Sequence, residues 1–197
     1  MIDLEKTPTI RADIELVRKL QSGDFQPIEV LMDRYGRDLI HYLASILNNR
    51  EKAEDVFQET WSRVLQSIRR FDLKQPFGPW LFRIARNLAY DELRKEKRSR
   101  SRFEEPREEK PIFEPSTESL FDRRLLERDL ARELLARLEP MYREILWLRF
   151  FKEKSYEEIA DYCRLPLGTV KTRLRRALER AGEVWEKAVG EQSHGRK

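Results

Sequence analysis

The stretch SYEEIADYCRLPLGTVKTRLRRALERA, Ser155 to Ala181, decides the fold of the C-terminal part of this chain. Ser155 is followed three residues later by Glu158, the spacing of a capping box, which predicts a helix over the next two turns. Pro166 breaks that pattern, and a second helix is expected to open at Gly168 or at the residue after it. Two short helices around a tight turn are typical of a helix-turn-helix.

The first of these helices is acidic, and the second is strongly basic. The second carries one acid, Glu179, and a row of cations: Lys171, Arg173, Arg175, Arg176 and Arg180. At about 100° per residue, the spacing predicts an apolar face with Val170, Leu174, Ala177 and Ala181. The face roughly opposite is polar, with Lys171, Thr172, Arg175 and Arg176. A basic helix face alone is more often a solvated surface, but the capping box and the turn favour an interpretation in which it binds phosphates.

Arg164 occupies the turn position where helix-turn-helix sequences often carry glycine. A non-glycine residue at positive φ is uncommon, because its side chain crowds the backbone. The sequence therefore leaves open whether this turn keeps its usual conformation or is reshaped.

The composition favours an all-α protein. Of 197 residues, 39% are charged and only 7 are glycine, and no stretch shows the two-residue alternation of a strand. The net charge is only +4, yet the basic residues are clustered, which indicates a polyanionic partner. A lone cysteine, Cys163, excludes a disulfide framework and favours a cytoplasmic setting. No long apolar run or export signal is present, so we expect no membrane insertion.

The N-terminal part of the chain is expected to form a four-helix domain over residues 1–98. Apolar residues recur at helical spacing from Ile14 to Ile68 and predict three helices. A loop over residues 71–78 follows. Pro79 then suits the first position of a fourth helix that reaches about Arg98.

The remainder of the chain is expected to form a linker and a second small helical domain. Residues 99–117 contain three prolines, dense mixed charge and no periodicity, which predicts a flexible linker. Leucine spacing predicts a helix from Leu125 to Leu138, and Ile145–Phe151 belongs to another helix before the helix-turn-helix. The second domain then covers residues 118–190, followed by a frayed tail over residues 191–197.

The predicted helix after Pro79 also divides into two faces. Its core face is apolar, and another face interleaves aromatic, cationic and amide groups: Trp80, Arg83, Asn87, Tyr90 and Arg94. That mixture suits bases and phosphates together. In the preceding loop, Phe77 lies beside Gly78 and could stack on an unpaired base. For any single aromatic residue, however, covering the edge of the core is the commoner role.

Three segments together resemble a known family: AEDVFQETW, then WLFRIARNLAYDELRK, then SYEEIADYCRLPLGTVKTRLRRA. In this order and spacing they are similar to the extracytoplasmic-function branch of bacterial sigma factors in the sigma-70 family. The resemblance covers most of the chain except the N-terminus, the linker and the tail. It implies an initiation subunit of RNA polymerase with a sigma-2-like and a sigma-4-like domain, which read the minus-ten and minus-thirty-five promoter elements.

The resemblance implies partners and their contact residues. Asp55, Gln58 and Glu59 match positions that bind the beta-prime clamp helices of core polymerase, and their i, i+3, i+4 spacing places them on one helix face. The beta flap of the polymerase, promoter DNA and an anti-sigma factor that covers both DNA-binding faces are the other implied partners. Judged without the resemblance, the face formed by Asp55, Gln58 and Glu59 is as often a merely solvated surface as a binding site.

The same resemblance implies the contacts with DNA. It assigns base capture and strand separation to residues 72–78 and the helix that follows, with Arg83, Asn87 and Arg94 as phosphate or base contacts. In the second domain it assigns the polar face of the basic helix to the major groove: Lys171, Thr172, Arg175 and Arg176. Arg149, shortly before the helix-turn-helix, is expected to add a phosphate contact.

The main rival is a helix-turn-helix regulator that binds operator DNA without being a polymerase subunit. Its N-terminal helices would dimerise or sense a ligand, and it would not require EDVFQE or WLFRIARN. An enzyme is disfavoured, because no phosphate-binding glycine loop is present. His41, Cys163 and His194 are too few and too scattered for a zinc site, so we expect no catalytic residue, metal or cofactor.

Overall fold

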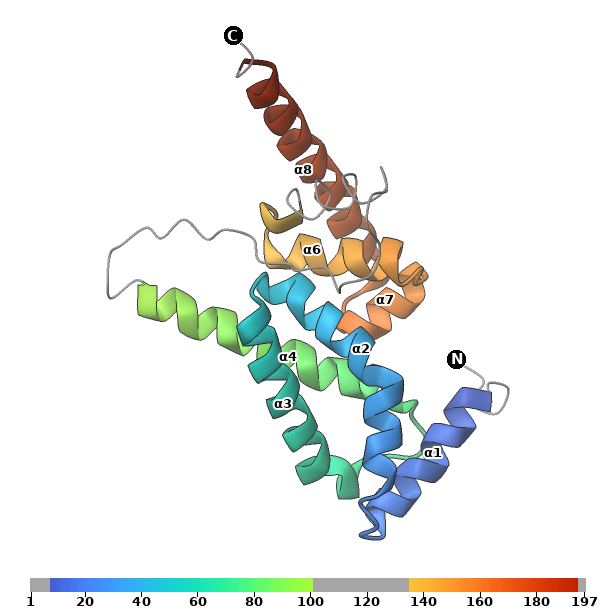
Figure 1. Ribbon diagram of the computed structural model, residues 1–197. Coiled ribbons are helices and arrows are strands. Elements are labelled where there is room, and N and C mark those ends of the chain that lie inside the picture. The colour runs from blue at the N-terminus through green and yellow to red at the C-terminus, as the bar shows by residue number, and fades with distance from the viewer. Residues whose placement is uncertain (1–7, 101–134, 195–197) are drawn as a thin grey trace, which may run out of the picture. The chain divides into compact units, whose positions relative to one another are not determined.

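The computed structural model describes residues 8–100 and 135–194, and all regular structure in these two ranges is helical (Figure 1). The described residues divide into two compact units, 8–43 with 51–100 and 44–50 with 135–194. The prediction of an all-α fold with two small helical units is therefore confirmed. The domain boundaries at residues 98, 117 and 190 stay predictions, and most of the expected linker lies outside the described residues.

The first unit is built from helices in the order that the apolar spacing predicts. They are α1 (Pro8–Gln21), α2 (Pro27–Leu47, of which the part up to Leu43 belongs to this unit), α3 (Arg50–Ser67), the 3-10 turn η1 (Ile68–Arg70) and α4 (Phe77–Arg100). Helix α4 begins at Phe77 rather than at Pro79. Pro79 thus lies in the first turn of the helix, where its missing N–H has no intrahelical carbonyl to bind.

The core of the first unit draws on all four helices. Val17, Leu31, Val64 and Leu81, one from each helix, have no exposed surface. Full burial of one such side chain contributes about 1.5–3 kcal/mol of hydrophobic free energy. This shared core fixes which faces of α3 and α4 point to solvent.

The second unit contains α6 (Pro140–Leu146), the π-helical turn η2 (Trp147–Phe151), α7 (Tyr156–Cys163) and α8 (Leu167–His194). The helix expected over 125–138 lies mostly outside the described residues. The tail expected to fray from residue 191 is instead helical as far as His194. No proline interrupts α8, and its glycines are tolerated at a modest cost within a long helix.

The helix-turn-helix forms as its sequence predicts, except that its second helix begins at Leu167 rather than at Gly168 or Thr169. The Ser155 Oγ accepts from the Glu158 N–H at 3.1 Å, and Glu158 Oε2 accepts from the Ser155 N–H at 2.8 Å, so both halves of the capping box are present. In the turn, Arg164 adopts the left-handed conformation with φ 51° and ψ 52°. The turn therefore keeps its usual shape with arginine in place of glycine, at a cost of about 1–2 kcal/mol.

The two faces expected for α8 are present. Val170, Leu174 and Ala177 are buried, as is Ile159 of α7, and α8 packs against α6 and α7. Ala181, expected on the same face, is only half-buried. The apolar face of α8 thus packs within the unit, and its basic face is exposed.

Candidate nucleic-acid and polymerase interfaces

The basic face of α8 is open to solvent along its whole predicted length. Lys171, Thr172, Arg175 and Arg176 are all exposed. Arg175 pairs with Glu179 one turn further on, with 2.6 Å between Nη1 and Oε1. Exposed pairs of this kind contribute about 0–1 kcal/mol, so the guanidinium can exchange Glu179 for another acceptor at small cost. Thr172 donates its hydroxyl hydrogen to the Gly168 carbonyl at 2.9 Å.

Arg149 is engaged within the second unit. Its Nη1 donates to the Lys154 carbonyl at 3.0 Å, and its guanidinium lies 5.3 Å from the centre of the Tyr156 ring. These contacts hold the segment that leads into α7. Because an arginine has five N–H donors, this structural role leaves others for a phosphate, and the expected DNA contact of Arg149 stays a prediction.

Glu158 combines burial with hydrogen bonds that favour its charge. Burial raises the pKa of Glu158, but hydrogen bonds from Lys154 Nζ and from the Ser155 N–H outweigh that effect, and the pKa falls below its ordinary value of 4.5. The Lys154 Nζ lies 2.8 Å from Glu158 Oε1. The capping box is thus an ionised one near neutral pH, and it fixes where α7 begins.

The mixed face of α4 presents its predicted residues with unequal exposure. Asn87 and Arg94 are exposed, whereas Trp80, Arg83 and Tyr90 are half-buried. Arg94 forms an ion pair with Asp91 on the same exposed surface. The face therefore offers one amide and one guanidinium directly, with two aromatic rings beside them.

Arg86 belongs to this surface and was not predicted. Its guanidinium lies 4.7 Å from the centre of the Tyr90 ring, an arrangement in which the cation covers the ring face. The spacing i, i+4 between Arg86 and Tyr90 was visible in the sequence and would have indicated this pair.

Phe77 is the one predicted site residue that the structure places in the core. Its ring is 1% exposed and lies 5.6 Å from Tyr35, 6.1 Å from Phe71 and 5.7 Å from Trp80, measured between ring centres. Since α4 begins at Phe77 and turns its side chain inward, the expected stacking of this ring on a base is not available in this structure.

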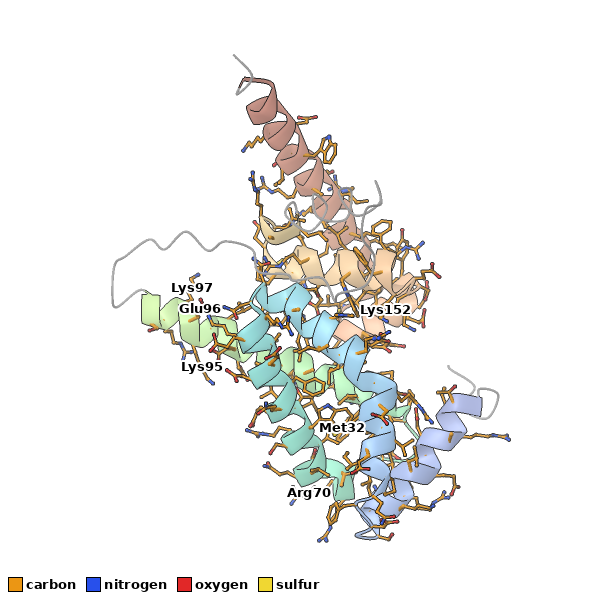
Figure 2. All side chains as sticks on the ribbon, in the orientation of Figure 1. Met32, Arg70, Lys95, Glu96, Lys97 and Lys152 are labelled. Carbon is orange, nitrogen blue, oxygen red and sulfur yellow. The ribbon has the colours of Figure 1, made fainter. Side chains whose placement is uncertain are left out.

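The segment between Phe71 and α4 is a short exposed loop over residues 72–76. It contains an Asx-type turn, in which Asp72 Oδ1 accepts from the Lys74 N–H at 2.9 Å and the Asp72 carbonyl accepts from the Gln75 N–H at 3.0 Å. Lys74 is exposed, as are Arg69 and Arg70 just before the loop. Figure 2 shows Arg70 at the end of the α3–η1 segment. These three cations were missed because they precede the predicted helix face, although their clustering could have indicated them.

The acidic face of α3 is exposed as its spacing requires. Asp55, Gln58 and Glu59 are all exposed, while Val56 and Thr60 between them are buried. Glu59 accepts from Arg63 Nε at 3.0 Å within the same helix. The face is therefore available to a partner.

Among residues 8–100 and 135–194, no three histidine, cysteine, aspartate or glutamate side chains lie together as metal ligands would. Nor does any helix within these ranges combine the length and apolar character needed to cross a bilayer.

Two regions of the chain match known families. Sigma-70 region 2 matches residues 31–99, and sigma-70 region 4 matches residues 128–180. The first region covers most of α2, all of α3 and nearly all of α4, and the second ends within α8, at Arg180. The exposed faces on α3, α4 and α8 all fall inside these two matches.

Curated relatives match across most of their length. The ECF RNA polymerase sigma factor SigX of Bacillus subtilis is 31% identical over 163 residues, which cover 78% of this chain and 81% of SigX. SigW, a second ECF RNA polymerase sigma factor of B. subtilis, is 28% identical and covers 83% and 91% of the two chains. The RNA polymerase sigma-H factor of Pseudomonas aeruginosa is 29% identical and covers 87% and 92%.

Solved structures of similar fold include proteins bound to partners. The sigma factor RpoE from Bartonella quintana, in complex with the anti-sigma factor NepR, matches with a TM-score of 0.68 at 25% identity, over 81% of this chain and 96% of that chain. CnrH, in complex with the cytosolic domain of CnrY, matches with a TM-score of 0.62 at 25% identity, over 89% and 98%.

Proposed function

This chain belongs to the extracytoplasmic-function branch of the sigma-70 family, and we propose that its three exposed faces divide the work of starting transcription. As an RNA polymerase sigma factor, it directs core polymerase to specific promoters. The observation that carries the division of labour is that one chain exposes an acidic face on α3 and two cation-bearing faces on α4 and α8, each backed by a buried core.

The basic face of α8 suits the major groove of the minus-thirty-five element. Arginine can bind guanine through two hydrogen bonds, and such a pair contributes about 1–3 kcal/mol of discrimination. Arg175 and Arg176 are exposed for this role, and Lys171 and Thr172 extend the surface toward phosphates. The positive end of the α8 dipole further favours a phosphate at its start.

The α4 face and the 72–76 loop suit the minus-ten element once its strands separate. Unstacking a base costs a few kcal/mol, which contacts with aromatic rings and cations can offset, so binding itself can drive melting. Trp80 and Tyr90 are the half-exposed rings, and Asn87 and Arg94 are the exposed polar contacts. Phe77 supports this surface from beneath rather than contacting a base.

The exposed face of α3 suits the beta-prime clamp helices of core polymerase, with Asp55, Gln58 and Glu59 as the contact residues. The second unit is expected to contact the beta flap. An anti-sigma factor is a further partner, because a similar structure contains one. The protein acts by binding rather than by catalysis, and it works in the cytoplasm, where polymerase and promoter meet.

Transcription in vitro tests this proposal. Purified bacterial core polymerase is mixed with the protein and a library of promoter fragments, and the 5′ ends of the transcripts are sequenced. Initiation at specific sites that depends on the protein would support the proposal and identify both promoter elements. Specific DNA binding without polymerase, combined with no initiation, would instead identify an operator-binding regulator.

A further inference from the structure

Helix α1 ends on a glutamine that reaches the loop of the first unit. Gln21 Nε2 donates to the Ile68 carbonyl at 2.9 Å and to the Phe71 carbonyl at 2.8 Å. These two carbonyls bracket η1 and the start of the 72–76 loop. Both hydrogens of the side-chain amide are therefore used to hold the backbone at the point where the loop begins.

A second contact from α1 reaches the other end of the same loop. Asp13, which is 1% exposed, accepts from the Tyr35 hydroxyl and from Arg34, both on α2. The Tyr35 ring in turn lies against the start of α4, where a Cβ added to Gly78 would be only 3.2 Å from Tyr35 Cε1. Asp13 thus fixes the ring against which the loop ends.

We propose that α1 is a positioning element for the 72–76 loop, with Gln21 holding its beginning and Asp13 holding its end through Tyr35. The loop's own hydrogen bonds form a single Asx-type turn, and the contacts from α1 add support at both of its ends, beside the buried Phe71 and Phe77. The matched sigma-70 region 2 starts at residue 31, beyond the end of α1. The inference rests on the proposed function, in which this loop takes part in strand separation.

The physical reason is the entropy of ordering. A loop that captures an unpaired base loses conformational freedom when it binds, and a loop already held in place loses less. Gln21 is half-buried, and its amide donates to two backbone carbonyls beside the loop, so we expect its effect to reach DNA through those carbonyls. It is expected to change the opening step rather than the first encounter with the promoter.

The test compares Gln21→Leu with a matched control, Gln66→Leu, in full-length protein bound to core polymerase. Gln66 is an exposed glutamine on α3 whose amide contacts only Ser62 nearby, at 3.3 Å. Closed-complex affinity is measured on duplex promoter, and opening is measured as the rate at which thymines become reactive to permanganate. We expect Gln21→Leu to slow opening by about tenfold, the effect of losing one or two hydrogen bonds, and to leave closed-complex affinity unchanged within about twofold.

A rescue variant separates positioning from loss of folding. Gln21→Lys retains N–H donors at the end of a flexible chain and is expected to restore most of the opening rate, whereas Gln66→Leu should open like the unmodified protein. If Gln21→Leu opens normally, or if it loses polymerase binding and opening in parallel and Gln21→Lys fails to restore opening, the proposal is overturned. If the unmodified protein does not initiate at all, the proposed function fails instead.

Discussion

Arg175 and Glu179 form a 2.6 Å ion pair on the exposed face of α8, so a predicted DNA contact is already held by a carboxylate one turn away. Both side chains are more than half exposed, at 67% and 52%. Solvent screens the pair, which therefore adds little to stability. Its consequence lies in DNA binding, because a phosphate or guanine competes with Glu179 for the N–H donors of Arg175.

Substitutions of Arg175 and of Glu179 should change the affinity for DNA in opposite directions. Arg175→Ala is expected to weaken binding to the minus-thirty-five element by about 1–3 kcal/mol, the loss of one base contact. Glu179→Gln should strengthen it modestly, because it replaces the carboxylate with a weaker, neutral acceptor and removes a charge that repels phosphates. Both effects are measured by fluorescence anisotropy with labelled duplex. If either substitution changed the affinity for core polymerase as much as the affinity for DNA, the assignment of this face to the minus-thirty-five element would be contradicted.

The α3 face should be separable from DNA binding. Replacing Asp55 and Gln58 together with alanine is expected to abolish binding to core polymerase, since both side chains are exposed and their removal disturbs no core contact. Glu15→Ala removes an exposed acid from α1 and serves as the control. Pull-down with core polymerase and circular dichroism provide the readouts. If the double variant bound polymerase as well as the unmodified protein, this face would be a solvated surface and not a polymerase contact.

Replacing the left-handed turn residue Arg164 with glycine should change the stability of the helix-turn-helix. Arg164→Gly relieves the crowding at φ 51° and is expected to stabilise the helix-turn-helix by about 0.5–1 kcal/mol after the entropic cost of glycine. Arg164→Ala removes the same side chain but keeps the Cβ, so it should bring no such gain. Amide hydrogen exchange in α7 measures the difference. A gain of the same size in both variants would show that the side chain, and not the backbone, carries the cost.

The ionised capping box should weaken in acid. The pKa of Glu158 is lower in the folded chain than its ordinary value of 4.5, so its contribution to stability is present above that value and is lost as the pH falls through the folded pKa. Glu158→Gln is expected to remove this part of the acid sensitivity, whereas Glu157→Gln, on an exposed neighbour, should retain it. Denaturant titrations followed by exchange in α7 between about pH 3 and pH 6 test the difference.

Alanine substitution of two helical glycines, Gly78 and Gly182, should change stability in opposite directions. At Gly78 a Cβ would lie 3.2 Å from a ring that Asp13 holds through the Tyr35 hydroxyl, so Gly78→Ala is expected to destabilise the first unit by about 1–2 kcal/mol. At Gly182 nothing lies within 4 Å, and alanine should stabilise α8 by up to about 1 kcal/mol. Thermal unfolding compares the two. If Gly78→Ala were instead more stable than the unmodified protein, the Tyr35 ring would have moved aside at little energetic cost.

Local features of the sequence were enough to predict the helix-turn-helix. The capping box of Ser155 and Glu158 lies within four consecutive residues, and the angular placement of Val170 and Leu174 follows from the helix repeat alone. The conformation of Arg164 was left open, because a left-handed arginine is tolerated only when the surrounding contacts outweigh its cost. The packing of α7 and α8 decided that point.

The sequence by itself determined the helix order of the first unit, the exposed polar faces of α3 and α8, and the family, since each depends on spacing within a few turns or on motifs in order. Only the tertiary structure decided that Phe77 is buried, because the rings around it come from three separate segments. It also brought Gln21 to carbonyls 47 and 50 residues further along the chain. A hydrogen bond at that separation leaves no periodic trace, because its partners are selected by how helices pack and not by their neighbours in sequence.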